Sequence, residues 1–204
     1  MTTNHANGDR RTQILEAACR VIARRGADGL RMGAVAREAG VSSALIHYYF
    51  ATRSDLLVHA FEHAEDKTDR AALDVIQRIE RPLPRLERLL LLYAGADPLF
   101  REDWILWVEM WRSAIYDEAL RGSVQRSTEY WNNQIAEVIS DAQEAGEISS
   151  DIVPQDSALR LAAVVDGLGL SIIIESIDHE RAQDLIRGAL RLELGLGQPT
   201  RSTL

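Results

Sequence analysis

A chain of 204 residues with 46% hydrophobic content can bury one substantial core or divide into a small domain and a larger one. Its single cysteine, Cys19, excludes a disulfide framework within the chain, and the lack of clustered cysteine and histidine spacing argues against structural zinc. The net charge of −8 disfavours a nucleic-acid partner on average, but residues 1–55 carry a net charge of +3 and the remainder carries −11. This asymmetry predicts separate tasks for the two parts.

The sequence also predicts a soluble protein with no membrane partner. Residues 1–9 are polar and lack the apolar core of a signal peptide. No segment offers the roughly 18 uninterrupted apolar residues that span a bilayer. We therefore expect a reducing, cytoplasmic location, associated with the nucleoid if the protein binds DNA.

The first quarter of the chain has the apolar spacing of short helices. Apolar residues recur at intervals of three and four over residues 14–22, which predicts a helix from about Asp9, a good N-cap, to Gly26. A second helix is predicted over residues 32–39. It ends at Gly40, because glycine favours the left-handed backbone just past a helix.

Two capping residues predict the next two helices. Ser42 is placed to cap a third short helix that ends near Tyr49. Thr52, followed three residues later by Asp55, predicts the start of a long fourth helix, which ends before Pro82. Further helices are predicted at about 83–96, 98–116, 118–145, 154–178 and 181–195.

The whole pattern predicts an all-α protein, because strand signals are nearly absent. Period-two alternation is not sustained, and the β-branched residues lie inside longer helical patterns. Residues 1–55 are predicted to form an N-terminal three-helix domain of the helix-turn-helix type. Residues 56–204 are predicted to form a larger helical bundle for ligand binding and dimerisation.

The second and third predicted helices have the dimensions of a helix-turn-helix motif. They are joined by the sequence Ala-Gly-Val-Ser, and in such a motif the second helix presents its side chains to the major groove. Apolar residues on the inner face leave five residues to face outward: Ser42, Ser43, Leu45, His47 and Tyr48. The spacing alone does not separate two interpretations: a DNA-binding motif, and three short helices that pack together without binding DNA.

Several runs in this region resemble the DNA-binding signature of the TetR family of repressors. They are VAREAGVS at residues 35–42, IHYYF at residues 46–50, Arg53 and Leu56-Leu57. The resemblance covers roughly residues 10–57. It implies a DNA-binding domain at the N-terminus, followed by a divergent helical ligand domain. Residues 99–148 are most similar to the repressors related to the choline-responsive BetI.

The resemblance implies a DNA-contact surface made of Ser42, Ser43, Leu45, His47, Tyr48, Tyr49 and Arg53. In it, Tyr48 reaches a base edge or a phosphate, and His47 and Tyr49 donate to phosphate. Ser42 and Ser43, at the positive end of a helix, can donate to a phosphate. Arg53 anchors phosphate where the family usually has lysine. Leu45 replaces the usual threonine and can contact a thymine methyl group.

Two departures from the family pattern affect the second helix. Gly33 replaces a residue that often contacts a base, and it has no side chain with which to do so. Leu30 and Arg31 stand where a serine or threonine cap is usual, which costs the helix about 1 kcal/mol. Both departures change which operator sequence is recognised rather than whether DNA is bound.

The last two predicted helices suit a homodimer interface. Apolar residues recur at helical spacing from Leu159 to Ile174 and from Leu185 to Leu192, and Gly167 and Gly169 permit close backbone approach. The alternative is an interior core helix, because residues 161–174 are apolar nearly all round. The resemblance implies dimerisation through these two helices, which a protein that binds two half-sites needs.

Three of the four tryptophans fall on one face of a predicted helix, at spacings of three and four. Such a stripe either packs into the core or lines a ligand cavity. In the second case the cavity is lined by Tyr93, Trp104, Trp107, Glu109, Trp111, Tyr130, Trp131 and Asp166. Aromatic faces with a nearby carboxylate favour a cationic ligand, such as a quaternary ammonium, or a hydrophobic one. Asp166 is the acid of most interest, because it interrupts an apolar run and needs a partner if buried.

These observations together predict a ligand-responsive repressor that binds palindromic operator DNA as a dimer and is released by a small-molecule inducer. No enzymatic activity, cofactor or metal is expected. The alternative is an all-α enzyme or a metal-binding bundle, since His59 and His63 lie four residues apart beside Glu62. No third ligand is evident, and the Glu-x-x-His pairs of di-metal bundles are absent from the sequence.

Overall fold

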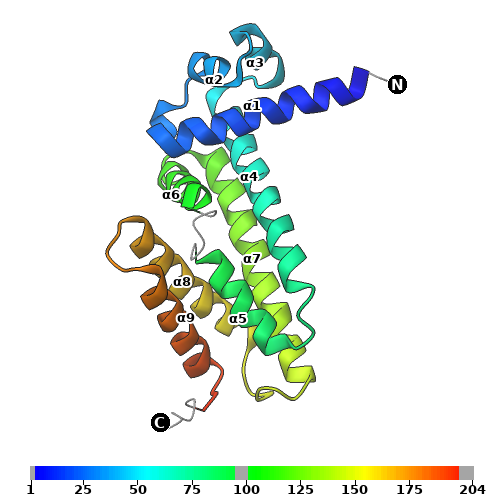
Figure 1. Ribbon diagram of the computed structural model, residues 1–204, viewed down its shortest axis with the longest axis vertical. Helices are drawn as coiled ribbons and strands as arrows, with labels where there is room; N and C mark the ends of the chain where they lie inside the picture. The colour runs from blue at the N-terminus through cyan, green and yellow to red at the C-terminus, as the bar shows by residue number, and fades with distance from the viewer. Residues whose placement is uncertain (1–2, 95–100, 198–204) are drawn as a thin grey trace. The chain divides into compact units, whose positions relative to one another are not determined.

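The computed structural model describes residues 3–94 and 101–197, and every regular element in these ranges is helical (Figure 1). The helices are α1 (Thr3–Arg25), α2 (Met32–Ala39), α3 (Ser43–Tyr49), α4 (Arg53–Ile76), α5 (Pro82–Tyr93), α6 (Arg101–Ala114), α7 (Glu118–Glu144), α8 (Pro154–Ile173) and α9 (His179–Glu193). A 3-10 turn, η1 (Ala27–Gly29), connects α1 to α2. The predicted all-α fold is confirmed. Within the described ranges, none of the helices is both long enough and apolar enough to cross a bilayer.

The turn between α2 and α3 is set by Gly40. Its φ of 65° and ψ of 33° are left-handed, a conformation that glycine adopts without the steric cost of a Cβ atom. The amide of Val41 donates to the carbonyl of Ala36 at 2.9 Å, and the amide of Gly40 donates to that of Arg37 at 3.3 Å. These bonds satisfy the last carbonyls of α2 and direct the chain into α3, as predicted.

The predicted side-chain caps are also present. The hydroxyl oxygen of Ser42 accepts from the amide of Leu45 at 3.2 Å, which caps α3. The hydroxyl oxygen of Thr52 accepts from the amide of Asp55 at 3.0 Å, which starts α4. The carboxylate of Asp55 reaches back to the amide of Ala51 at 2.9 Å rather than to that of Thr52.

The first helix begins earlier than the sequence analysis predicts. α1 begins at Thr3, so Asp9 lies inside the helix and is not its N-cap. Because no proline interrupts this polar segment, the helix continues through it ahead of the apolar repeat. The predicted end near residue 96 and start near residue 98 lie outside the described residues.

The chain divides into two compact units. Unit 1 comprises residues 1–71 and 101–126, and unit 2 comprises residues 72–100 and 127–204. Unit 1 therefore contains α6 and the beginning of α7 in addition to the helix-turn-helix. The predicted boundary after residue 55 concerns which part binds DNA and which binds ligand, and it stays a prediction.

Unit 1 is built on α1, which packs against α2 and α6, while α2 packs against α3 (Figure 1). Its largest fully buried side chains are Ile14, Ile22, Leu30, Ile46, Phe50, Leu56, Leu57, Phe61 and Met110. Met110 comes from α6, and it belongs to the same hydrophobic cluster as the residues of the helix-turn-helix. The core of the predicted DNA-binding domain thus extends into α6.

Unit 2 is built on α8 and α9, which pack against each other and against α5 (Figure 1). Buried leucines of α5, among them Leu86 and Leu90, and buried residues of α8 and α9, among them Leu161 and Ile186, form its interior. The loop after α7 is tied to the start of α5 by Glu147, which accepts from the Leu83 amide at 2.8 Å.

Candidate DNA-binding and ligand-binding sites

Helix α3 exposes one face to solvent. Ser43 and His47 are exposed, and Tyr48 is 73% exposed. On the opposite face, Ile46 and Phe50 are fully buried and hold the helix on the core of unit 1. Since Tyr48 buries little of its ring, it adds little to the stability of the fold and is available to a partner.

Leu45 and Tyr49 lie at the edge of this exposed face rather than on it. Both are half-buried and pack against the core of unit 1. The expectation that Leu45 faces outward is therefore corrected. The outward position belongs to Ala44, because residues 43, 44, 47 and 48 share a face at helical spacing. That spacing was available in the sequence, and contact with DNA stays a prediction for all seven residues.

Ser42 combines capping with exposure. Its hydroxyl oxygen accepts the Leu45 amide, but a serine hydroxyl also has one O–H donor. The residue is exposed at the N-terminus of α3. Its predicted contact with a phosphate is thus compatible with its role as a cap.

A basic cleft that the sequence analysis missed lies beside α2. It has a volume of about 580 Å³ and is lined by three arginines, Arg25, Arg31 and Arg37, with Asp28 as an acid. Gly33 also lines the cleft, and a Cβ atom at this position would meet nothing within 4 Å. Gly33 therefore adds no side chain to this lining.

Arg53 has an intramolecular role that the sequence did not predict. Its Nε donates to the carbonyl of Leu30 at 2.9 Å, and one of its Nη atoms donates to the carbonyl of Ala27. The start of α4 is thus tied to the connection between α1 and α2. The side chain remains 44% exposed, so its contact with phosphate stays a prediction beside this bracing role.

Helix α6 braces the same connection from another side. The carboxylate of Glu109 accepts from the amide of Ala27 at 2.8 Å. Arg112 pairs with Asp28 and with Glu109, each at 3.2 Å, and these hydrogen bonds, that to Asp28 first, raise the pKa of Arg112. Gly26 has a φ of 69°, and a Cβ atom there would lie 3.2 Å from Oε1 of Glu109. Glu109, predicted as a ligand-binding acid, is engaged in this brace, and its ligand role stays a prediction.

The tryptophan stripe of α6 packs within unit 1. Trp107 meets Phe61 of α4 edge to face, with ring centroids 4.6 Å apart, and the rings of Trp107 and Trp111 are 5.6 Å apart. Trp104 is buried and contacts Trp111. A cavity of about 10 Å³ lies beside Phe61 and Trp107, enough for about one water molecule. The core interpretation fits this conformation, and a ligand role stays a prediction.

The other three aromatic residues of the predicted cavity belong to unit 2. Tyr93 of α5 contacts Trp131 of α7 edge to face. The rings of Tyr130 and Trp131 are 6.2 Å apart, and Tyr130 is 42% exposed. The predicted lining residues therefore form two aromatic clusters, one in each unit.

The outer face of α8 and α9 carries an exposed apolar stripe. On α8 and its C-cap the exposed residues recur at intervals of three and four, namely Leu159, Ala163, Asp166, Leu170 and Ile174. On α9, Leu185 and Leu192 are exposed. Gly167 is also exposed, whereas Gly169 is buried within unit 2. We call Leu159, Leu170, Ile174, Leu185 and Leu192 the apolar stripe.

Asp166 interrupts this apolar stripe. Part of the residue reaches solvent, but burial of the carboxyl group raises its pKa to about 6. No hydrogen bond or ion pair joins it to another residue within 3–94 and 101–197. Its helical position places it with the predicted dimer-forming residues. Its predicted role as an acid of the ligand cavity stays a prediction.

The histidines considered as metal ligands make other contacts. His59 lies 3.1 Å from Glu62 and 3.3 Å from Asp55. Burial lowers the pKa of His63. Among the residues with described side chains, no group of three or more histidine, cysteine, aspartate or glutamate residues is placed to hold a metal ion.

A helix-turn-helix with an exposed second helix, joined to a larger helical body, defines a DNA-binding transcriptional regulator. Two family matches agree with this class. The family described as bacterial regulatory proteins of the tetR family matches residues 14–60, and the C-terminal part of BetI-type transcriptional repressors matches residues 82–195. The chain therefore belongs to the TetR family of transcriptional regulators, with a C-terminal part of BetI type.

Individual relatives agree over most of the chain. The BetI regulator of Agrobacterium fabrum is 30% identical over 165 residues, which cover 78% of this chain and 74% of its own. A TetR-family regulator from Rhodococcus sp. has a similar structure, with a TM-score of 0.83 and 35% identity over 92% of this chain and 99% of its own. A regulator from Saccharomonospora viridis, solved in complex with choline, has a TM-score of 0.81 and 28% identity over 89% of this chain and 95% of its own. The predicted family and the predicted function as a TetR-type regulator are confirmed, and the enzyme alternative is not favoured.

Proposed function

We propose that the protein is a homodimeric repressor in the cytoplasm, bound to a palindromic operator through its two α3 helices and released by a small-molecule inducer. The observation that carries the proposal is the exposed face of α3. Tyr48, 73% exposed beside His47 and Ser43, stands on a helix that is anchored on its opposite side by the fully buried Ile46 and, at its C-cap, Phe50. Such a rigidly held polar and aromatic face suits contacts with base edges and phosphates.

The apolar stripe supports the dimer. A single helix-turn-helix contacts one half-site, so a palindromic operator requires a second copy of the chain. Rows of exposed leucine and isoleucine are rare on monomeric surfaces and are typical of interfaces. Leu192, 83% exposed, and Ile174, 65% exposed, are the residues that gain most from being covered by a partner copy.

The brace made by α6 suggests how an inducer acts. The tryptophan stripe and Glu109 belong to the same helix, and Glu109 holds the amide of Ala27 in η1. The carbonyl of Ala27 is in turn held by Arg53, at the start of α4. A ligand that displaces the tryptophans shifts α6, and this shift reaches η1 and the beginning of α4. The orientation of α3 then changes, because α2 and α3 follow η1 directly.

A cationic inducer is the form that the aromatic residues favour most. Indole faces attract ammonium groups by about 0.5–2 kcal/mol each, and the similar regulator from Saccharomonospora viridis was solved with choline. Choline and its neutral isostere 3,3-dimethylbutanol separate a cationic site from a merely hydrophobic one. We expect choline to raise the melting temperature more than the isostere does. A ligand at 100 times its Kd raises the free energy of unfolding by about 2.7 kcal/mol. Equal shifts for the two compounds would assign a hydrophobic inducer instead.

DNA binding is tested by fluorescence anisotropy with labelled DNA from upstream of the protein's own gene. Wild-type protein should bind with an affinity that falls steeply as salt increases. Tyr48→Ala should weaken binding by about tenfold, the effect of about 1.4 kcal/mol. Tyr116→Ala is the matched control, because Tyr116 is an 84% exposed tyrosine that follows α6 and is not among the seven predicted DNA-contact residues. A wild-type protein without salt-dependent binding, or equal losses in both variants, would refute the proposed interface.

A further inference from the structure

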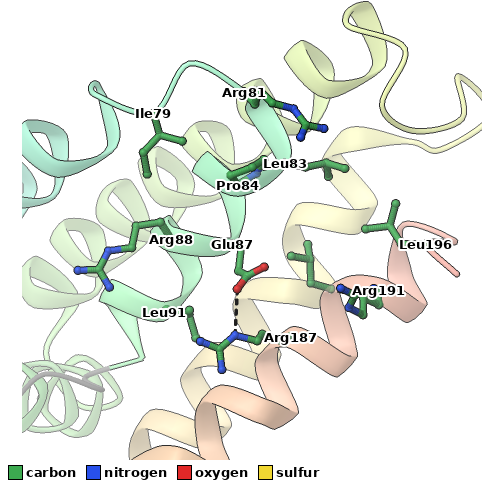
Figure 2. Close-up of a pocket in the computed structure, with 11 residues that line it drawn as sticks. Ile79, Arg81, Leu83, Pro84, Glu87, Arg88, Leu91, Arg187, Arg191 and Leu196 are labelled. Atoms are coloured by element: carbon green, nitrogen blue, oxygen red, sulfur yellow. Dashed lines mark hydrogen bonds and ion pairs between the residues drawn. The ribbon is translucent and has the colours of Figure 1, made fainter. Parts of the chain in front are cut away.

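A cleft of about 520 Å³ lies between α5 and α9 in unit 2 (Figure 2). Leucines form much of its lining, with Leu91 and Leu190 buried and Leu83 and Leu196 half-buried. Small-molecule sites have volumes of about 300–1,000 Å³ and mostly apolar linings. The cleft therefore has the size and the floor to accept the hydrocarbon part of a small ligand.

The lining of the cleft is also rich in arginine. Four arginines take part in it, namely Arg81, Arg88, Arg187 and Arg191. Among the described lining residues the one acid is Glu87, which faces Arg187 across the cleft with Oε1 2.9 Å from Nε (Figure 2). This basic lining contrasts with the net charge of −11 on residues 56–204. Anions are thus favoured at this place on an otherwise acidic part of the chain.

Two of the four arginines have no carboxylate partner within the part of the chain that the structure describes. Arg81 pairs with Glu147 at 2.8 Å, and Arg187 pairs with Glu87. Arg191 instead donates to the neutral carbonyl of Gly197 at 3.0 Å, and Arg88 makes no ion pair with any residue that the structure describes. The guanidinium groups of Arg88 and Arg191 therefore remain uncompensated in charge.

We propose that this cleft binds a small amphiphilic anion, whose carboxylate or phosphate group pairs with Arg88, the lining arginine that makes no ion pair among the described residues, and whose hydrocarbon chain covers the leucines. A guanidinium group forms two parallel hydrogen bonds with either anion. Glu87 stands in the lining and repels a ligand with many negative charges, so one anionic group is favoured over a polyanion. The cleft lies wholly in unit 2, so the proposal does not depend on the tryptophan stripe of unit 1 or on DNA binding.

The test is isothermal titration calorimetry of the full chain with decanoate, at concentrations where decanoate is monomeric. We expect saturable binding with one decanoate per chain. Decyltrimethylammonium, which has the same chain and the opposite charge, and butyrate, which has the same head and a short chain, should each bind at least tenfold more weakly. The double variant Arg88→Gln/Arg191→Gln should lose at least tenfold in affinity for decanoate. Arg181→Gln is the control for the single variant Arg88→Gln, because it also removes one positive charge, from an exposed position in the first turn of α9.

The single variant Arg88→Gln tests binding with little risk of a folding defect. Arg88 is exposed and makes no ion pair among the described residues, so the substitution removes no ion pair from the fold. It should show the same direction of change as the double variant. The proposal is overturned if decanoate shows no saturable binding, if the ammonium compound binds equally well, or if the arginine variants bind decanoate as the wild type does. Loss of binding in Trp107→Ala alone would place decanoate at the tryptophan stripe, which overturns this proposal and leaves the proposed repressor function standing.

Discussion

The helix-turn-helix of unit 1 and the α8–α9 surface of unit 2 expose side chains for partners in different ways. In unit 1, the exposed face of α3 is set by contacts a few residues apart, the left-handed Gly40 and the Ser42 cap. In unit 2, the apolar stripe runs along two helices whose inner faces pack against α5. The first surface is thus held by contacts within a few residues, whereas the second leaves apolar side chains exposed on the single chain.

This difference explains why the helix-turn-helix carries specific residue types at fixed positions, whereas the α8–α9 surface shows only apolar residues at helical spacing. A surface held by local turns restricts the residue types at fixed positions, since glycine and a capping hydroxyl are required there. A surface made by whole helices requires only apolar residues at helical spacing, and many sequences meet that condition. If this difference holds, α3 depends on rigid internal support and the apolar stripe depends on a partner.

The largest expected effect is on the core beneath α3. Phe50 is fully buried, and Phe50→Ala should lower the free energy of unfolding by about 3–5 kcal/mol. Tyr48→Ala, on the exposed face of the same helix, should change it by no more than about 0.5 kcal/mol. Urea unfolding followed by circular dichroism measures both variants. Similar losses in the two would mean that Tyr48 supports the fold and is not held free for DNA.

The next effect concerns the brace at the start of α4. Arg53→Ala removes the donors to the carbonyls of Ala27 and Leu30 and should cost about 1–3 kcal/mol. Arg53→Lys keeps the positive charge for a phosphate but lacks the forked donors, so it should lose much of the same stability. Thermal unfolding and DNA affinity are measured on both. If the lysine variant unfolds at the wild-type temperature, Arg53 serves only as a phosphate anchor.

A somewhat smaller effect is expected where α6 meets η1. Glu109→Ala leaves the Ala27 amide without its acceptor and should cost about 1–2 kcal/mol. Glu109→Gln keeps an acceptor oxygen and should cost less than half of that. The difference between the two, measured by urea unfolding, isolates the bond between α6 and η1. If Glu109→Ala is as stable as wild type, α6 does not brace the helix-turn-helix and the proposed path from inducer to α3 fails.

The features that the sequence predicted well are the local ones. Gly40, Ser42 and the Thr52–Asp55 pair act within a few residues, so their types alone identify the turn and the two helix starts. The contacts of Glu109 with Ala27 join residues 82 positions apart, and only the tertiary fold brings them together. The same holds for the two carbonyl contacts of Arg53. Long-range polar contacts leave no periodic signal in a single sequence.

The position of Asp166 is an intermediate case. The exposed residues of α8 follow a regular spacing of three and four that includes it, and that spacing was visible in the sequence. The sequence predicts a ligand role for Asp166 instead, because aromatic faces with a nearby carboxylate favour a cationic ligand. The spacing predicts which residues share a face of the helix, but the packing of the helix decides which face is covered. The exposure of the face that carries Asp166 therefore follows only from the fold.

The smallest expected effect is a pH dependence of the dimer at Asp166. Its pKa is raised to about 6, so in the folded chain this carboxyl keeps its proton to a higher pH than an ordinary aspartate does, and covering the stripe with a partner adds to the cost of the ionised form. The dimer should therefore be weaker at pH 8, where the group is ionised, and should tighten several-fold as the pH falls through 6 to 5. Asp166→Asn is neutral at both values and should bind its partner copy tightly at each. Sedimentation equilibrium of both proteins measures the two dissociation constants. A wild-type dimer equally stable at pH 8 and pH 5 would place Asp166 outside the interface, and the apolar stripe would then meet its partner without covering the middle of α8.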